Sequence, residues 1–220
     1  MKRIHTQNQL QDFLDAEFGW RLKEISTLKT AVKSSGFISE RTLVRAGVAL
    51  LYAHWEGFIK NAATGYVEYV NSQGLAYTEL QACFVVLGFK KTLHEIKESR
   101  QTHLNVAAVD FMRDGLSKKS QMKIDTAINT ESNLSAAVFE NILITVGFDP
   151  AAYEAKANLI NESLLKRRNH IAHGEYIDVA KDDWSNLADE ILVMLRQFKT
   201  DIENAMALNS FKRATPVATG

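Results

Sequence analysis

Residues 46–58 of the chain read AGVALLYAHWEGF. Apolar residues occupy nearly every side of a helix built from it, and helices of that kind lie at the centre of a helical bundle. The stretch forms the middle of a helix that we expect from about Ser39 to Asn71. Polar residues in or beside it stand out, because an unpaired charge is costly in apolar surroundings. These residues are Arg45, His54 and Glu56.

The segments around this helix show the three-and-four spacing of apolar residues that is typical of amphipathic helices. A capping box at Thr6–Gln9 opens the first of them, which ends near residues 34–36. Further helices are expected at about 78–99, 106–112 and 134–146, from Asp149–Pro150 to the C′ residue Gly174, and from Asp182 or Asp183 onward. The buried stripe of the last helix comprises Trp184, Leu187, Ile191, Met194, Leu195, Phe198, Ile202 and Met206.

The composition supports an all-α fold. Only two prolines and eleven glycines occur in 220 residues, and such a composition favours long helices over a turn-rich β fold. We therefore expect an up-and-down helical bundle that forms a single domain over residues 1–208. It contains a helical insertion at about 75–133 and is followed by a flexible, disordered tail at 209–220. A two-residue bridge near residues 175–179 is the most sheet that we expect.

Charge and cysteine content restrict the function and the compartment. The chain has 26 basic and 26 acidic residues, which argues against a general nucleic-acid coat protein but permits a local basic pocket. The single cysteine, Cys83, excludes an internal disulfide, fits a reducing cytosol and lies in an apolar run that indicates a buried, inert thiol. The sequence shows neither an N-terminal signal core nor an apolar run long enough to span a membrane. We expect a soluble, cytoplasmic protein that does not associate with membranes.

A second stretch, residues 166–174 with the sequence KRRNHIAHG, concentrates the chemistry of the chain. At about 100° per residue, Asn169 and His173 fall on one face of a helix, whereas Arg168 lies roughly 140° from His173 and must reach round to share a ligand. A neutral imidazole can take a proton from a hydroxyl at neutral pH, and a guanidinium fits a phosphate bidentately. Cleavage of RNA by its own 2′-hydroxyl requires such a base and phosphate clamp, and it needs no metal. We expect the side chains of Arg168 and His173 to lie near solvent at the helix end.

The spacing Arg168-Asn169-x-x-x-His173, near the end of an apolar helical pattern, resembles the R-x(4–6)-H signature of the HEPN superfamily. The stretch Leu51–Lys60, with its Trp-Glu pair, looks like the second helix of stand-alone bacterial HEPN proteins. This resemblance implies a metal-independent endoribonuclease that leaves a 2′,3′-cyclic phosphate and a 5′-hydroxyl. It also implies a homodimer in which two copies of the motif face each other across a composite active site. The implied setting is a growth-arresting toxin or an antiviral defence effector, with an antitoxin or another defence protein as a possible partner.

Within this resemblance the residues take different roles. His173 takes the 2′-hydroxyl proton or protonates the leaving 5′ oxygen, Arg168 holds and stabilises the phosphate, and Asn169 orients it. Arg167 and Lys166 supply positive potential rather than specific contacts, and loss of His170 is expected to be milder than loss of His173. Arg45 and His54 are supporting candidates. Glu56 either pairs with Arg45 or Arg168 as structure or faces the site and orients the catalytic groups.

Other interpretations compete with this assignment. The three cations could simply favour the helix dipole at a C-terminus, although that does not explain the asparagine and the two histidines. A metal site would use His170 and His173 with Glu56 or His54, but the sequence lacks the Glu-x-x-His repeat of di-metal bundles, so we expect no metal and no other cofactor. Large aromatic residues such as Trp55 and Trp184 indicate core packing more than base stacking. A HEPN-like module that binds RNA, a nucleotide or a protein without cutting, or a bare helical interaction protein, remains the alternative function.

Overall fold

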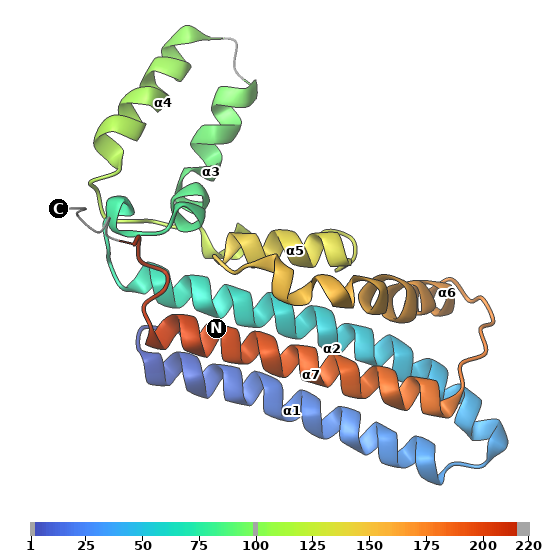
Figure 1. Cartoon of the computed structure of the whole chain (residues 1–220). Coiled ribbons are helices and arrows are strands. Elements are labelled where there is room, and N and C mark those ends of the chain that lie inside the picture. Colours follow the sequence, from blue (N-terminus) through green and yellow to red (C-terminus); the bar gives the residue numbers. More distant parts are fainter. Residues whose placement is uncertain (1–2, 99–100, 215–220) are drawn as a thin grey trace.

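The computed structural model describes residues 3–98 and 101–214, and its regular structure in these ranges is helical, with no strand beyond two isolated bridges. Three long helices pack side by side as the body of the bundle: α1 (Gln7–Ser34), α2 (Phe37–Ser72) and α7 (Lys181–Ala207) (Figure 1). The all-α bundle expected from the sequence is confirmed. No helix in the described part of the chain is both long and apolar enough to cross a membrane.

Local sequence signals set the ends of the long helices. Thr6 and Gln9 form the expected capping box, in which the side chain of each residue bonds the backbone N–H of the other. The expected caps of α7 are wrong: Ala180 is the N-cap, and Asp182 and Asp183 lie in the first turn, where carboxylates favour the helix dipole. The predicted apolar stripe of α7 is buried throughout, from Trp184 to Met206.

Helix α2 is the centre of the bundle, as its apolar sequence predicts. Trp55, Phe58 and Ile59 are all fully buried in one continuous core that reaches from the N-terminal segment to Phe211. At Gly47 the backbone of α2 comes so close to α7 that an added Cβ would lie 2.7 Å from the ring of Trp184. The glycine therefore permits the close approach of these two helices.

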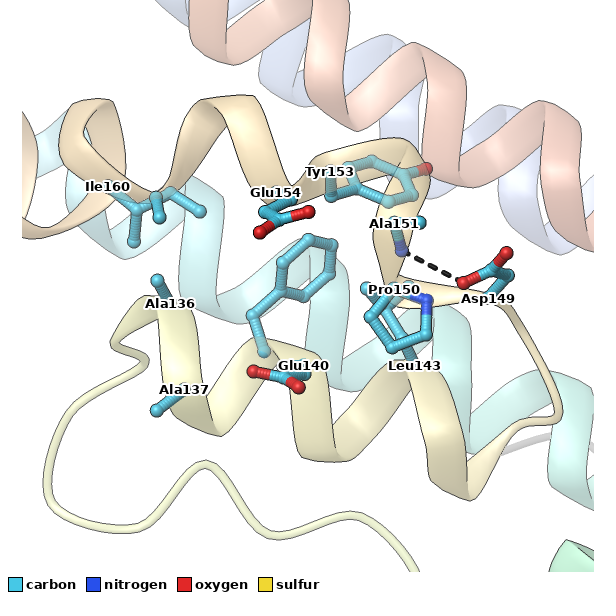
Figure 2. A pocket seen from close by; sticks show the side chains of 12 residues that line it. Ala136, Ala137, Glu140, Leu143, Asp149, Pro150, Ala151, Tyr153, Glu154 and Ile160 are labelled. Atoms are coloured by element: carbon cyan, nitrogen blue, oxygen red, sulfur yellow. Dashed lines mark hydrogen bonds between the residues drawn. The ribbon is translucent and has the colours of Figure 1, made fainter.

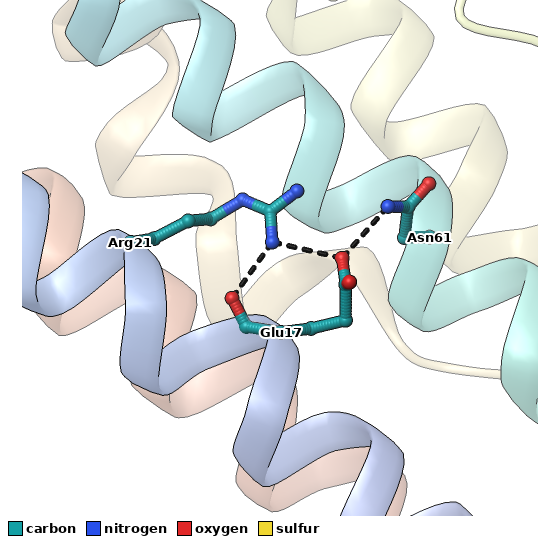
Figure 3. Close-up of polar contacts among 3 residues, drawn as sticks. All are labelled: Glu17, Arg21 and Asn61. Carbon is teal, nitrogen blue, oxygen red and sulfur yellow. Dashed lines mark hydrogen bonds and ion pairs between the residues drawn. The ribbon is translucent and has the colours of Figure 1, made fainter.

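The core also contains a charged residue that the sequence analysis did not single out. Arg21 is only 4% exposed; its guanidinium donates to the Glu17 carboxylate at 2.8 Å, and Asn61 of α2 donates to the same carboxylate at 2.7 Å (Figure 3). Arg21 lies seven residues after Leu14 and four before Ile25, on the buried face of α1. This position in the helical repeat is the signal that could have identified it.

A further row of helical segments lies over α2 and carries the motif (Figure 1). It begins with α5 (Ala136–Thr145) and continues after Asp149, whose side chain accepts the Ala151 N–H at 3.0 Å. The chain that we expected as one helix from Pro150 changes type twice. A 3₁₀ segment, η3 (Pro150–Lys156), precedes a π-helix, η4 (Leu159–Lys166), and the regular helix α6 (Arg167–Ala172) follows.

Two helices, α3 (Ala82–Glu98) and α4 (Thr102–Gly115), project as a hairpin from the end of the bundle opposite α6 (Figure 1). They lie within the stretch expected as a helical insertion, but α4 is longer than the predicted 106–112. The predicted start at Thr78 is a short 3₁₀ turn, η1 (Tyr77–Glu79), and the predicted end at Ser99 lies outside the described residues. A second 3₁₀ turn, η2 (Ile124–Thr126), interrupts the link back to α5.

The chain after α7 folds back on the bundle instead of leaving it. Phe211, expected in the flexible tail, is 1% exposed and packs against the ring of Tyr69, with 5.9 Å between the ring centroids. Backbone hydrogen bonds join Gln81 to Phe211 and Arg213 to Glu79, so the segment 209–213 is ordered by its buried aromatic ring. Residues 215–220 of the expected tail lie outside the described residues. The bridges are Ala76–Lys119 and Leu80–Lys212, and the described segment 175–179 forms none.

Candidate functional site

The motif lies at the C-terminal end of α6, which closes as its sequence predicts. Gly174 adopts a left-handed φ of 79°. Its N–H bonds the carbonyl of Ile171 at 3.1 Å, and the N–H of Glu175 bonds the carbonyl of His170 at 2.9 Å. These two bonds are those of a Schellman motif, so the C′ position predicted for Gly174 is confirmed.

A small second core fixes this end of the helix to the bundle. Ile171 and Ile177, on either side of the turn, pack against a cluster of buried apolar side chains. The cluster comprises Val32, Val44, Val48, Val179 and Trp184. Because α1, α2 and α7 all contribute to it, the residues around the turn stand on a rigid support.

Arg168 points toward the bundle. Its guanidinium lies over the ring of Tyr52, 3.8 Å from the centroid, and donates to Oδ1 of Asn133 at 2.5 Å, while its buried Nε has no hydrogen-bond partner in the described structure. The hydroxyl of Tyr52 accepts the Leu134 N–H at 2.7 Å, and burial raises the pKa of Tyr52 above its ordinary value. The arginine is therefore half-buried and fixed by contacts from α2 and from the link before α5, and the expectation that it lies near solvent is wrong.

The other motif residues open onto the opposite side. Asn169, His170 and His173 line one shallow surface pocket of about 330 Å³ together with Lys166 and Glu175. The pocket is completed by Asn161, Glu162 and Leu165. His173 is exposed, as expected. Arg168 does not line this pocket; its guanidinium lies against Tyr52 and Asn133 instead.

His170 has a carboxylate partner. Its Nδ1 is hydrogen-bonded to the Glu175 carboxylate, and both side chains are about half exposed. Arg45 of α2 donates to the backbone carbonyl of Glu175 at 3.1 Å, and its guanidinium lies 5.6 Å from the ring centroid of Tyr176. The structure therefore brings Arg45 to the end of the motif helix, through the residue that holds His170.

The two remaining cations of the motif differ in exposure, because Lys166 is exposed and Arg167 is partly buried. Lys166 pairs with Glu162, one turn earlier, at 2.7 Å, and both side chains are about 60% exposed. Surface pairs of this kind contribute little to stability. Arg167 has no ion-pair partner among the residues of the described ranges.

The structure places the other two candidates of α2, His54 and Glu56, in different surroundings. His54 is buried against α1, and its Nε2 lies 2.9 Å from a Glu24 carboxylate oxygen in a geometry that gives no hydrogen bond. The Trp20 ring packs edge-on against the imidazole, with 5.2 Å between the ring centroids. Burial lowers the pKa of His54, and the nearby Glu24 opposes this shift. His54 is therefore not brought to the motif. Glu56 pairs with neither Arg45 nor Arg168 in the described structure.

Glu56 nevertheless lies close to the contacts of Arg168. It is one helical turn from Tyr52, and its charge adds to the burial that raises the pKa of that phenol. Sequence reasoning missed Tyr52, Asn133 and Glu175. Tyr52 stands in the apolar stretch quoted above, but Asn133 lies 35 residues before Arg168 and has no local signal. For Glu175 a signal was available, because the turn at Gly174 brings this residue back to His170.

A larger pocket, of about 540 Å³, lies between α5 and η3 and has a different character (Figure 2). Its charged lining residues are the carboxylates of Glu140, Asp149 and Glu154, and the buried ring of Phe139 also lines it. Three carboxylates repel a phosphate, so this pocket does not suit RNA. No group of three or more metal-ligating side chains converges within the described ranges of the chain.

Comparison with known proteins identifies the family. No curated protein and no solved structure gives a significant match to the chain. The family model described as RiboL-PSP-HEPN matches residues 16–204, a range that begins in α1, ends in α7 and includes the whole motif. The chain therefore belongs to the RiboL-PSP-HEPN family.

Proposed function

We propose that the protein is a metal-independent endoribonuclease that cleaves RNA by attack of the 2′-hydroxyl. The observation that carries the proposal is the exposed imidazole of His173, which shares an open pocket with Asn169 at the end of a cationic helix. Membership of the HEPN group, whose domains are commonly ribonucleases, supports it. The products are a 2′,3′-cyclic phosphate and a 5′-hydroxyl.

Each group has a role that follows from its chemistry. His173 removes the 2′-hydroxyl proton, Asn169 orients the phosphate by hydrogen bonding, and Arg168 stabilises the charge of the pentacovalent phosphate. Lys166 and Arg167 add positive potential at the helix end. Acid–base catalysis of this kind contributes about 10²–10⁴ in rate, and a well-placed charged donor about 10²–10³.

The active unit that we propose is a homodimer. Within one chain Arg168 and His173 lie on different sides of α6. Among the described residues, the pocket beside α6 therefore contains a base but no guanidinium. A two-fold axis near this helix would bring a second copy of the motif and complete a composite site. The setting that we propose is cytoplasmic growth arrest or antiviral defence, with an antitoxin or other defence protein as a regulatory partner.

One observation favours a different function. The contacts of Arg168 with Tyr52 and Asn133 explain the arginine as a structural residue that joins α6 to α2. In that case the protein is a non-catalytic HEPN-like module that binds RNA, a nucleotide or a protein partner. The two functions differ in whether purified protein cuts RNA.

The decisive experiment incubates the pure protein with labelled single-stranded RNA in excess EDTA. We expect cleavage to persist in EDTA, to leave cyclic phosphate ends, to weaken steeply with salt and to fail on DNA, which has no 2′-hydroxyl. If EDTA stops cleavage and Mg²⁺ or Mn²⁺ restores it, the metal-free scheme is wrong. Binding of RNA without cleavage would support the alternative module.

Substitutions connect the activity to the site. We expect His173→Ala and Arg168→Lys to reduce cleavage by about 10²-fold or more, the second because an ammonium cannot reproduce the bidentate fork of a guanidinium. Lysine is chosen over alanine because truncation would also remove the contacts with Tyr52 and Asn133 and disturb the packing of α6. His5→Ala and Arg113→Ala, which alter exposed side chains outside the motif, are the matched controls and should cleave normally.

A further inference from the structure

The pocket beside α6 contains a second imidazole that is held more firmly than the first. The Nδ1 of His170 is hydrogen-bonded to the carboxylate of Glu175, whereas the exposed ring of His173 has no side-chain partner in the described structure. A carboxylate at Nδ1 makes this nitrogen the N–H donor, fixes the ring orientation and leaves Nε2 as the nitrogen available to a ligand. His170 therefore presents one defined ring nitrogen for proton transfer.

The fold holds Glu175 at this position from two sides. Its own N–H bonds the carbonyl of His170 in the Schellman turn, and Arg45 of α2 donates to its carbonyl oxygen. The turn itself depends on the left-handed Gly174. The pairing thus rests on the backbone of the turn and on a neighbouring helix, and not on two free surface side chains alone.

We propose that His170 is a second catalytic residue, the general acid that protonates the leaving 5′ oxygen, and that Glu175 is its positioning residue. This inference rests on the proposed ribonuclease function and extends it. RNA cleavage by the 2′-hydroxyl requires one proton to be removed and one to be supplied. The pocket of a single chain contains both imidazoles, which assigns the two transfers to two residues of the same chain.

The step balances without a further reagent. The oxygen of the 2′-hydroxyl forms a bond to phosphorus as its proton passes to His173. His170 enters the step as the imidazolium, with its Nδ1–H held by Glu175; the bond from phosphorus to the 5′ oxygen breaks, and the Nε2 proton passes to that oxygen. His173 then releases its proton to water and His170 takes one up, which restores the starting state.

The charges around His170 come from three elements. Glu162 and Lys166 of η4 form an ion pair with each other at the edge of the same pocket. Glu175 follows the motif helix, and Arg45 of α2 is directed to the carbonyl of that residue. The Glu175 carboxylate is thus the charged group that contacts the His170 imidazole directly. A substitution that neutralises Glu175 therefore isolates the effect of this carboxylate.

A substrate with a sulfur leaving group tests the acid role directly. RNA in which a bridging sulfur replaces one 5′ oxygen releases a thiolate, which leaves without being protonated. We expect His170→Ala to slow cleavage of ordinary RNA by about 10²-fold, less than His173→Ala does, and to cleave the sulfur-substituted bond at a rate within a few-fold of that of the unaltered protein. His173→Ala should remain slow on both substrates, because it removes the base.

The same pair of substrates tests the role of Glu175. Glu175→Gln should slow cleavage of ordinary RNA but leave cleavage of the sulfur-substituted bond within a few-fold of the unaltered protein, because the His170 ring loses its charged partner while the base is unchanged. A residue that merely stabilises the turn would slow cleavage of both substrates equally.

The outcomes separate this inference from the function on which it rests. If the unaltered protein cleaves neither substrate, the proposed ribonuclease function fails. If it cleaves both and His170→Ala is unimpaired, or is equally impaired on both substrates, the acid assignment is wrong while the ribonuclease function stands. His5→Ala provides the matched histidine control for each measurement.

Discussion

At the level of single residues, burial distinguishes the histidine of residues 46–58 from the two histidines of residues 166–174. His54 is 2% exposed between α1 and α2, while His170 and His173 lie at an open pocket. Both kinds of histidine stand near a carboxylate or a cation in the sequence, so their surroundings in the chain do not distinguish them. Only the faces on which the helices pack decide which imidazole is open to a ligand.

The buried His54 should make stability depend on pH. Burial lowers the pKa of His54 in the folded chain below its ordinary value of about 6.5, so on acidification the unfolded chain takes up a proton before the folded chain does. The free energy of unfolding should therefore be unaffected by this group above about pH 7 and fall as the pH decreases below about 6.5. Urea unfolding between pH 7.5 and pH 5 measures this slope.

The matched variant for this measurement is His54→Gln, which keeps a polar side chain of similar size and does not titrate. The free energy of unfolding of this variant should fall less steeply on acidification than that of the unaltered protein, and the difference is the contribution of one histidine. Equal slopes in the two proteins would show that Glu24 compensates the cost of burying the imidazolium.

At the scale of the helix, the closest approach in the bundle depends on a missing side chain. We expect Gly47→Ala to destabilise the protein by about 1–3 kcal/mol, because its Cβ would overlap the Trp184 ring and force α2 and α7 apart. Gly19→Ala in α1 is the matched control: nothing lies within 4 Å of its added Cβ, so it should stabilise the protein by about 0.5–1 kcal/mol. Thermal or urea unfolding of the two variants measures both signs, and equal effects would contradict the packing argument.

Helix periodicity predicts the long elements well, and the capping box predicts the start of α1. Both signals are local, and α1 and α7 bury the stripes that their spacing indicates. The segment after Pro150 shows where such signals end. A π-helix uses the same residue types as an α-helix, and its extra residue per turn depends on packing against neighbours, so η4 could not be read from the sequence.

The candidate site was predictable to the same extent. The motif and its closing glycine are encoded in nine consecutive residues, and the structure places them at one helix end as expected. The inward turn of Arg168 depends on Asn133 and Tyr52, which meet it only through tertiary packing. The segment 209–213 is a similar case, because Phe211 is ordered by a pocket that distant helices create.

For the whole molecule, the prediction is a homodimer formed around the motif end. Sedimentation at tens of micromolar should give the mass of two chains. Ala172→Arg, at an exposed position of α6, should shift the population toward the monomer and reduce cleavage in parallel, because it adds charge and bulk to the proposed interface. Ala107→Arg, at an exposed position of the hairpin at the other end, should leave both properties unchanged. A monomer with full activity would refute the composite site.

The ordered segment after α7 offers an attachment point at the end of the bundle opposite α6. Lys212 is exposed there, while Cys83 is partly buried and burial raises the pKa of its thiol to about 11, so it reacts poorly with alkylating reagents at neutral pH. A thiol introduced by Lys212→Cys would therefore take up a dye or a tether almost alone. A chain immobilised through that point would turn α6 away from the support and leave its pocket open to RNA in solution (Figure 1).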